Sequence, residues 1–220
     1  MLFANNRNPA LETNANDLRR HEDLGKLKDA LSLLISWLLS NEMKIYRSLS
    51  SSNDMFRDFW KAALAYQTSK QLPLWPAYPE QRIKDETHAG LHFSVFMPDD
   101  VLAGYFSIAF SDELIWGEKE RGDAIYIHRI CVNPSRKGNN LTAHILSWAY
   151  GYALVAKRQF IRMDTWGDNQ QLVNYYIACG FQHVGNRRLG SVPELPPHYS
   201  KANLALFENM VDLTPHTKKA

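Results

Sequence analysis

The feature that most constrains the fold of this chain is a β-branched run that leads through a short polar loop into a helix. Residues 124–132 (AIYIHRICV) are apolar at nearly every position, which is typical of a central strand. A polar loop follows at 133–140, and apolar side chains then recur every three or four residues through 141–157, as in a helix. A second strand and helix are expected at 160–165 and 169–179. Two successive strand–loop–helix units require crossover connections, so the sequence predicts a mixed α/β domain.

Further elements are expected around these two units. Strand patterns occur at 43–49, 91–97, 101–110, 181–189 and 202–210. A helix is expected at 54–69, and a short one from Pro79, because proline suits the first helical turn.

The predicted domain spans residues 43–212, between two segments of different character. Residues 1–42 are expected to form a flexible, Asn-rich tail and a helical extension, and residues 213–220 a polar C-terminal tail. Met43 begins the first predicted strand, which leaves two alternatives open. Residues 1–42 are a genuine appendage, or the native product starts at Met43.

Composition excludes several classes of protein. With 220 residues, 45% hydrophobic and 22% charged, the chain is long enough for a full core. A net charge of +2 forces no basic face, so nucleic-acid binding is not expected. Two cysteines exclude a disulfide scaffold and favour the reducing cytoplasm. The most apolar stretch, residues 30–39, is about half of the roughly 20 residues that a membrane span needs.

The loop before the helix at 141–157 is a candidate anion site. The first N–H groups of a helix are unpaired and point in one direction, where the helix dipole favours a phosphate. Gly138 permits close approach of the backbone, Asn139 and Asn140 tolerate left-handed angles, and Lys137 adds positive charge. Taken alone, such a loop is more often a capped helix start without a ligand.

Four blocks in this order resemble the GNAT superfamily of N-acetyltransferases over about residues 43–210. The blocks are IHRICVNP (127–134), KGNNLT (137–142), MDTW with Asn169, and NYY followed by GF (174–181). DELIWGE (112–118) and LPPHY (195–199) are similar to a bacterial branch with undefined substrates. The resemblance implies a central mixed, mostly antiparallel sheet of six or seven strands, splayed at the cofactor site and flanked by helices.

The resemblance also implies a site for acetyl-CoA as co-substrate. The end of the central strand would pair with the pantetheine arm, the loop would hold the pyrophosphate, and Asn169 would hydrogen-bond the arm. The implied cofactor residues are Ile130, Cys131, Val132, Lys137, Gly138, Asn139, Asn140, Leu141, Thr142, Asn169 and Tyr176. Asn140 and Thr142 stand where the family commonly has Gly and Gly or Ala, and their Cβ atoms narrow the room for a pyrophosphate.

The implied reaction moves an acetyl group directly to a primary amine of a small molecule or an amino-acid-like substrate. The resemblance makes Tyr176 the general acid for the leaving thiolate, and the Val132 N–H the donor to the oxyanion. Without it, Tyr176 would be interpreted as an aromatic residue at the edge of the core.

Two residues are candidate bases. His128 lies an even number of residues from Ile130 and Val132, so it is expected on their face of the strand. Its imidazole would suit proton removal near neutral pH, and a packed core histidine is the alternative. Asp164 on the next strand is the second candidate, with an ion pair to an arginine as its alternative.

The sequence contains no metal-ligand pattern and leaves other functions open. No Cys or His cluster has metal-ligand spacing, so no metal is expected. The aromatic residues Trp75, Tyr78, Trp116 and Tyr199 would line an acceptor pocket or pack their own loops. Two alternative functions stay open: a catalytically silent acyl-CoA-binding or regulatory module on the same fold, and a protein N-terminal or lysine acetyltransferase. A homodimer is also left open.

Overall fold

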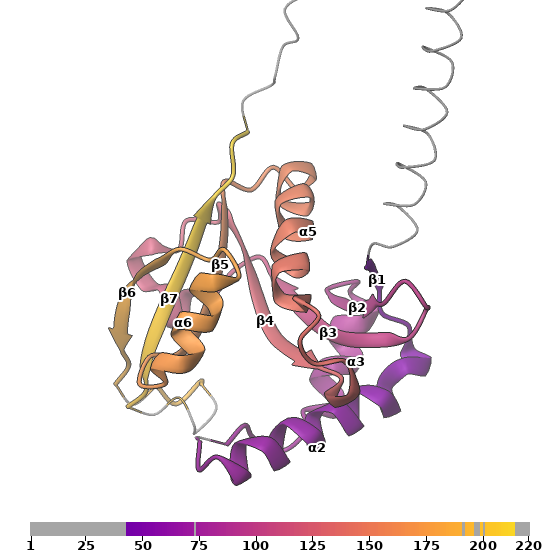
Figure 1. Cartoon of the computed structure of the whole chain (residues 1–220). Coiled ribbons are helices and arrows are strands. Elements are labelled where there is room, and N and C mark those ends of the chain that lie inside the picture. The colour runs from indigo at the N-terminus through magenta and orange to yellow at the C-terminus, as the bar shows by residue number, and fades with distance from the viewer. Residues whose placement is uncertain (1–42, 73, 191, 196–198, 200, 214–220) are drawn as a thin grey trace, which may run out of the picture. The chain divides into compact units, whose positions relative to one another are not determined.

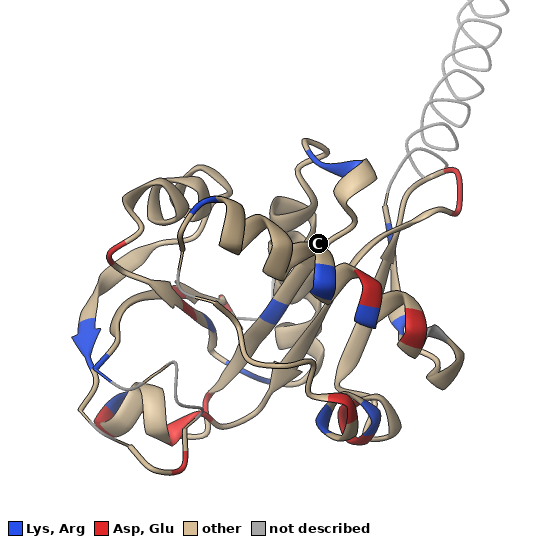
Figure 2. Ribbon diagram, turned by 90° about the horizontal axis from the view of Figure 1, so that it is seen from below, with Lys and Arg blue, Asp and Glu red and all other residues tan. Residues whose placement is uncertain are grey.

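The computed structural model describes residues 43–213, except residues 73, 191, 196–198 and 200. The tail and helix expected in residues 1–42, and the tail expected at 214–220, lie outside the described residues. Within the described part, no helix has the length and hydropathy needed to cross a membrane. Figure 2 shows acidic and basic residues interleaved along the elements rather than gathered on one side.

In the described part of the chain, seven strands form one mixed sheet, which confirms the predicted class (Figure 1). Along the sheet their order is β1-β2-β3-β4-β5-β7-β6. The parallel pair is β4 with β5, and the other pairs are antiparallel. The strands are β1 (Lys44–Arg47), β2 (His92–Phe96), β3 (Leu102–Ala109), β4 (Ala124–Val132), β5 (Phe160–Trp166), β6 (His183–Arg188) and β7 (Asn203–Met210).

Helices cover both faces of this sheet. The face under α5 (Leu141–Val155) and α6 (Gln170–Ala178) holds the largest apolar cluster, and is called the α5 face below. The opposite face, called the α2 face, carries the side chains that pack with α2 (Asn53–Ser69), α3 (Glu80–His88) and α4 (Glu113–Trp116). The sequence pattern predicted α2, α3, α5 and α6, whereas α4 lies in a stretch expected to be a polar connection. Short 3-10 turns, η1 (Ser50–Ser52), η2 (Gly117–Lys119) and η3 (Pro134–Arg136), complete the described elements.

β4 runs through the middle of the core because both of its faces are covered. Ile125 and Ile127 are almost fully buried on the α5 face, and Ala124 and Tyr126 are fully buried on the α2 face. Each such large apolar side chain stabilises the fold by about 1.5–3 kcal/mol. This double burial explains the nearly continuous apolar run in the sequence.

β4 and β5 diverge soon after they begin. In the described chain they pair only where Ala124, Ile125 and Tyr126 meet residues 160–162. β4 then continues to Val132 and β5 to Trp166 without further pairing between them. Helices α5 and α6 follow these two strands, so both helix N-termini lie toward the open end of the gap (Figure 1). The splay that the resemblance implied is therefore present.

A β-bulge interrupts β4 at Arg129. Tyr105 of β3 pairs with Cys131 of β4, and Ser107 pairs with His128. Two residues along β3 therefore correspond to three residues along β4, so β4 holds one extra residue. Arg129 takes a left-handed φ of 52°, as one residue of a bulge often does. The extra residue shifts the alternation of all later side chains by one.

The prediction that His128 shares a face with Ile130 and Val132 is wrong. Ile130 and Val132 pack against the core of the α5 face. His128 instead lies 3.6 Å from Asp112, which directly precedes α4 on the α2 face. The period of two that supported the prediction holds only in an uninterrupted strand, and the bulge breaks it.

Candidate functional site

Three polar side chains converge beside the gap between β4 and β5. They are Asp112 before α4, His128 on β4 and Asp164 on β5, each partly buried. One ligand atom from each lies within 4.8 Å of the others. We call these three residues the acidic cluster. Sequence reasoning had selected His128 and Asp164 and missed Asp112.

Asp112 is held in place by its own loop. Its backbone N–H donates to Glu120 Oε2 at 2.9 Å, which closes the loop between β3 and β4. Its buried Oδ2 atom has no hydrogen-bond partner among the described residues. A buried carboxylate oxygen without a donor is costly, so this position suits a ligand that brings N–H groups.

Burial shifts the pKa values of all three groups. It raises the pKa of Asp164 to about 7, with a contribution from the nearby Asp112 charge. It also raises the pKa of Asp112 to about 6. Burial, followed by the Arg129 charge, lowers the pKa of His128 to about 3. At neutral pH His128 is therefore neutral, and Asp164 is the group in the cluster best matched to accept a proton.

Tyr176 lies on α6, the helix that packs on β5 at the α5 face. Its ring packs against Phe181 and Phe207, with centroid separations of 5.9 and 5.7 Å. Burial is the main cause of its raised pKa, and the charge of Asp164 also contributes. The phenol therefore stays protonated at neutral pH and lies within electrostatic range of Asp164.

The predicted anion loop has the backbone that a phosphate cradle needs. Gly138 has φ 85°, and a Cβ added there would meet open space. Asn140 has φ 52° and ψ 27° and precedes the first turn of α5. Asn139 does not adopt the left-handed conformation expected for it, and its side-chain amide donates to the Arg136 carbonyl at 2.9 Å. The left-handed angles and the open space at Gly138 leave room for an anion, and the pyrophosphate site stays a prediction.

Side chains around the loop are held by neighbouring helices. The Lys137 ammonium lies over the Tyr66 ring of α2, 4.8 Å from its centroid. The Thr142 hydroxyl is buried and accepts a hydrogen bond from the Tyr175 hydroxyl at 2.9 Å. Thr142 thus connects α5 to α6. Because its hydroxyl is engaged by Tyr175, an anion at this helix end would bind the backbone N–H groups of α5.

Asn169 caps α6. Its side-chain oxygen accepts a hydrogen bond from the Leu172 N–H at 3.1 Å. A capping residue at this position fixes the direction of the helix that carries Tyr176. Its predicted contact with the cofactor arm stays a prediction.

The end of β4 is shaped by a close approach of β3. Cys131 is buried on the α2 face, and burial raises the pKa of its thiol to about 12, so it is no nucleophile at neutral pH. A Cβ added at Gly104 would lie 2.4 Å from the Cys131 carbonyl oxygen. Glycine at 104 therefore permits the backbone course of residues 130–132.

Most of the aromatic residues expected near the acceptor pack their own loops instead. Trp75 and Tyr78 both contact the ring of Trp60. Trp116 is buried and stacks under the Arg162 guanidinium. Tyr199 differs, because its pKa responds to the charges of Asp164 and Asp112 and its ring stacks on Trp166. Tyr199 and Trp166 thus form a stacked pair, and Tyr199 lies within electrostatic range of the acidic cluster.

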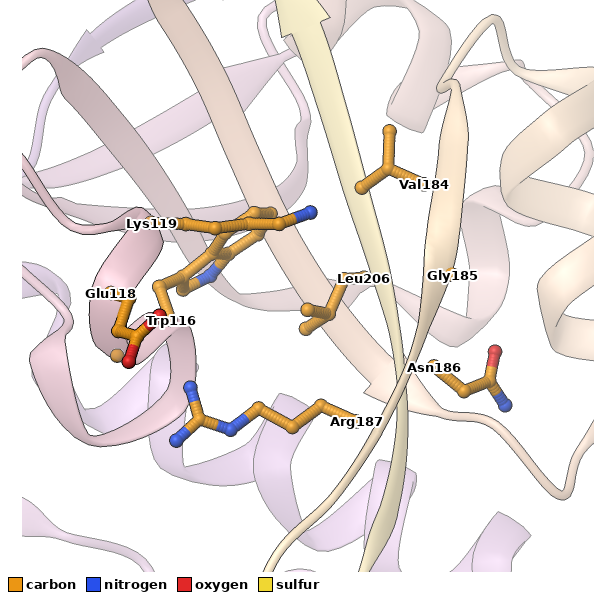
Figure 3. A pocket seen from close by; sticks show the side chains of 9 residues that line it. Trp116, Glu118, Lys119, Val184, Gly185, Asn186, Arg187 and Leu206 are labelled. Atoms are coloured by element: carbon orange, nitrogen blue, oxygen red, sulfur yellow. The ribbon is translucent and has the colours of Figure 1, made fainter.

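A separate cavity of about 440 Å³ lies between η2 and β6 (Figure 3). Trp116 and Leu206 contribute apolar surface, and Lys119 and Arg187 carry charge at its sides. None of the predicted catalytic or cofactor residues lines it. The cavity is therefore distinct from the site built around the acidic cluster.

The acidic cluster also has the composition of a divalent cation site. Two carboxylates and an imidazole are three ligands of the kind that catalytic metal sites use. Sequence spacing could not reveal this set, because its members come from three separate elements. The expected absence of a metal stays a prediction.

Comparison with known proteins identifies the family. The family model described as Acetyltransferase (GNAT) family matches residues 53–181. The chain therefore belongs to the GNAT acetyltransferase family. Among curated proteins it matches the uncharacterized N-acetyltransferase YesJ of Bacillus subtilis, with 29% identity over 98 residues. That match covers 43% of this chain, and the chain spans about half, 54%, of the length of this relative.

Solved structures show the same fold. A GNAT family acetyltransferase from Listeria monocytogenes aligns with a TM-score of 0.61 and 17% identity, over 77% of this chain and 95% of that one. YncA of Salmonella typhimurium, solved with its cofactor acetyl-CoA, aligns with a TM-score of 0.56 and 12% identity, over 81% and 99%. A spermidine N-acetyltransferase from Vibrio cholerae, in complex with CoA and spermine, aligns with a TM-score of 0.53 and 11% identity, over 76% and 95%.

Proposed function

We propose that this protein is an N-acetyltransferase that moves the acetyl group of acetyl-CoA to a primary amine of a small molecule or an amino-acid-like substrate. Its family membership supports the reaction class. The observation that carries the proposal is the divergence of β4 from β5 beyond residues 124–126, which leaves the edge of β4 open between the loop at Gly138 and Asp164 of β5. Tyr176 on α6 offers an acid, and Asp164 on β5 offers a base.

Acetyl-CoA fits the gap from the α5 face. The cradle at Gly138 and the first turn of α5 would receive the pyrophosphate. The unpaired edge of residues 127–132 would hydrogen-bond the pantetheine arm, as an added strand does. This arrangement directs the thioester toward Tyr176 and the acidic cluster.

The acceptor amine would approach from the α2 face. Asp112 and Asp164 attract its ammonium form, and Asp164 takes the proton that must leave before nitrogen can attack. The nitrogen then bonds to the thioester carbon, loses its second proton to solvent from the tetrahedral intermediate, and the carbon–sulfur bond breaks. Tyr176 gives its hydroxyl proton to the departing thiolate, and solvent restores that proton afterwards.

The first test pairs cofactor binding with turnover. Acetyl-CoA is titrated into the protein by calorimetry, and amine-dependent release of the CoA thiol is followed. We expect saturable binding, and we expect Tyr176→Phe to lower kcat by about 10²–10⁴-fold without weakening binding, because the thiolate loses its acid. Tyr152→Phe, which removes a hydroxyl in the aromatic cluster with Phe93 and Trp148, is the control.

The outcomes separate the alternatives. Binding of acetyl-CoA without turnover of any amine would favour the silent acyl-CoA-binding module. An undiminished kcat in Tyr176→Phe would remove Tyr176 from the mechanism. Turnover confined to peptide substrates would favour the protein acetyltransferase.

A further inference from the structure

A group of opposite charge adjoins the acidic cluster on the α2 face. Arg82 and Arg129 share one carboxylate, that of Glu86 on α3. Arg82 Nε lies 3.0 Å from Glu86 Oε1, and Arg129 pairs with Glu86 Oε2 and donates to Ser107 Oγ at 2.7 Å. Two guanidinium groups and one carboxylate leave a net charge of +1. We call these three residues the arginine pair with Glu86.

The bulge in β4 brings this positive group next to the negative one. Arg129 is the residue directly after His128, and His128 Nε2 lies 3.6 Å from Asp112 Oδ2. Arg82 also acts electrostatically on Asp112 and on His128 from α3. The site therefore has a carboxylate end and a guanidinium end within one region of the α2 face.

Tyr199 lies within electrostatic range of both ends. Burial is the main cause of the raised pKa of its hydroxyl; the charges of Asp164 and Asp112 raise it further, and those of Arg129 and Arg82 lower it. The two ends themselves are joined by contacts, because Glu86 binds Arg82 and Arg129, and Arg129 directly follows His128, which lies 3.6 Å from Asp112. The stacked rings of Tyr199 and Trp166 add an apolar surface at this position.

Exposure distinguishes the members of the positive end. The side chains of Arg129 and Glu86 are 16% and 14% exposed, whereas that of Arg82 is 61% exposed. Arg82 donates to Glu86 through its Nε, and its guanidinium carries two terminal nitrogens that can donate as well. A guanidinium of this kind can bind a carboxylate through two parallel hydrogen bonds.

We infer that the acceptor carries a carboxylate beside its amine, as an amino acid does, and that Arg82 binds this carboxylate while Asp112 and Asp164 hold the ammonium. The inference rests on the proposed acetyltransferase activity and selects one acceptor class within it. A zwitterion matches a site whose two ends have opposite charge. A polyamine would instead place a second cation near Arg82 and Arg129, which costs energy through like-charge repulsion.

The test compares matched acceptors. Leucine and phenylalanine are assayed beside isoamylamine and phenethylamine, which lack the carboxylate, with spermidine as a third class. We expect kcat/KM to favour the amino acids, and Arg82→Gln to reduce that preference by about 10–100-fold through a higher KM. Arg82→Lys should restore part of it, because the charge returns without the planar fork. Lys84→Gln on the same helix, which removes an exposed pair with Glu80, should leave the preference unchanged.

Each result decides one of the two proposals. A higher kcat/KM for the amines without a carboxylate, or for spermidine, overturns the inference and leaves the acetyltransferase activity standing. A preference for amino acids that survives Arg82→Gln also overturns the role of Arg82. Failure to bind acetyl-CoA at all would count against the proposed function, and the inference would fall with it.

Discussion

Asp164 is the residue whose surroundings do most for the proposed chemistry. An ordinary carboxylate is too weak a base at neutral pH, and burial beside Asp112 raises the pKa of Asp164 to about 7. The same burial makes its charged form unfavourable in the folded protein. The raised pKa makes Asp164 a stronger base and lowers the stability of the folded protein at neutral pH, as is common for groups in active sites.

A pH profile tests this assignment. We expect kcat/KM to rise as pH increases through about 7, because Asp164 must lose its proton to act as a base. Asp164→Asn should remove this rise and lower kcat by about 10²-fold or more. Since the folded pKa lies above the unfolded one, ionisation costs stability as pH rises from about 4 through 7, so the variant should unfold at a higher temperature than the wild type at pH 8. A wild-type rise retained in Asp164→Asn would assign the base elsewhere.

At the scale of the elements, the bulge in β4 organises the site. It turns His128 toward the α2 face and leaves Ile130 and Val132 on the α5 face. It also aims Arg129 at Glu86 of α3. Gly104 on β3 accommodates the backbone that follows this bulge, because the Cys131 carbonyl oxygen lies where a side chain at position 104 would begin.

A substitution at Gly104 should disturb both the fold and the cofactor site. A Cβ 2.4 Å from the Cys131 oxygen must displace the backbone at the end of β4. We expect Gly104→Ala to cost about 1–3 kcal/mol in the free energy of unfolding and to weaken acetyl-CoA binding. Urea denaturation and calorimetry measure the two effects.

The matched control is Gly151→Ala within α5. A Cβ there meets open space, so alanine should instead stabilise the helix by about 0.5–1 kcal/mol. Equal effects of the two alanines on unfolding would contradict the close contact at Gly104.

At the scale of the whole domain, Arg162 joins the elements that surround the acidic cluster. Its buried guanidinium, 4% exposed, pairs with Glu208 of β7 at 2.7 Å and donates to the Lys119 carbonyl at 3.0 Å. It also donates to the Tyr126 hydroxyl at 2.8 Å and lies over the ring of Trp116. One side chain thus connects β4, β5, β7 and the loop that carries Asp112.

Removing this connection should destabilise the domain as a unit. We expect Arg162→Met to lower the free energy of unfolding by about 3 kcal/mol, because Glu208 loses its partner in a largely buried place. Arg188→Met, at an exposed position on β6, should change it by less than about 0.5 kcal/mol. A shift of similar size in both variants, measured by urea denaturation, would contradict the role of Arg162.

Local patterns in the chain were sufficient for the order of the strands and of the described helices other than α4, for the β4–α5–β5 crossover and for the loop at Gly138. Helical spacing, strand runs and glycine positions act over a few residues, so each can be interpreted without knowing its neighbours in space. Tyr176 and Asp164 could be selected in the same way, once motifs of a known family marked their positions. Their surroundings, the buried acidic cluster for Asp164 and the ring contacts with Phe181 and Phe207 for Tyr176, needed the structure.

The acidic cluster and the arginine pair with Glu86 arise from contacts between distant segments. Asp112 meets His128 and Asp164, and Arg82 of α3 meets the same region through Glu86. The face on which His128 lies depends on a single inserted residue, whose left-handed conformation at Arg129 has no clear local pattern in the sequence. Side-chain convergence and strand register depend on how segments pack against one another, and local periodicity does not encode that packing.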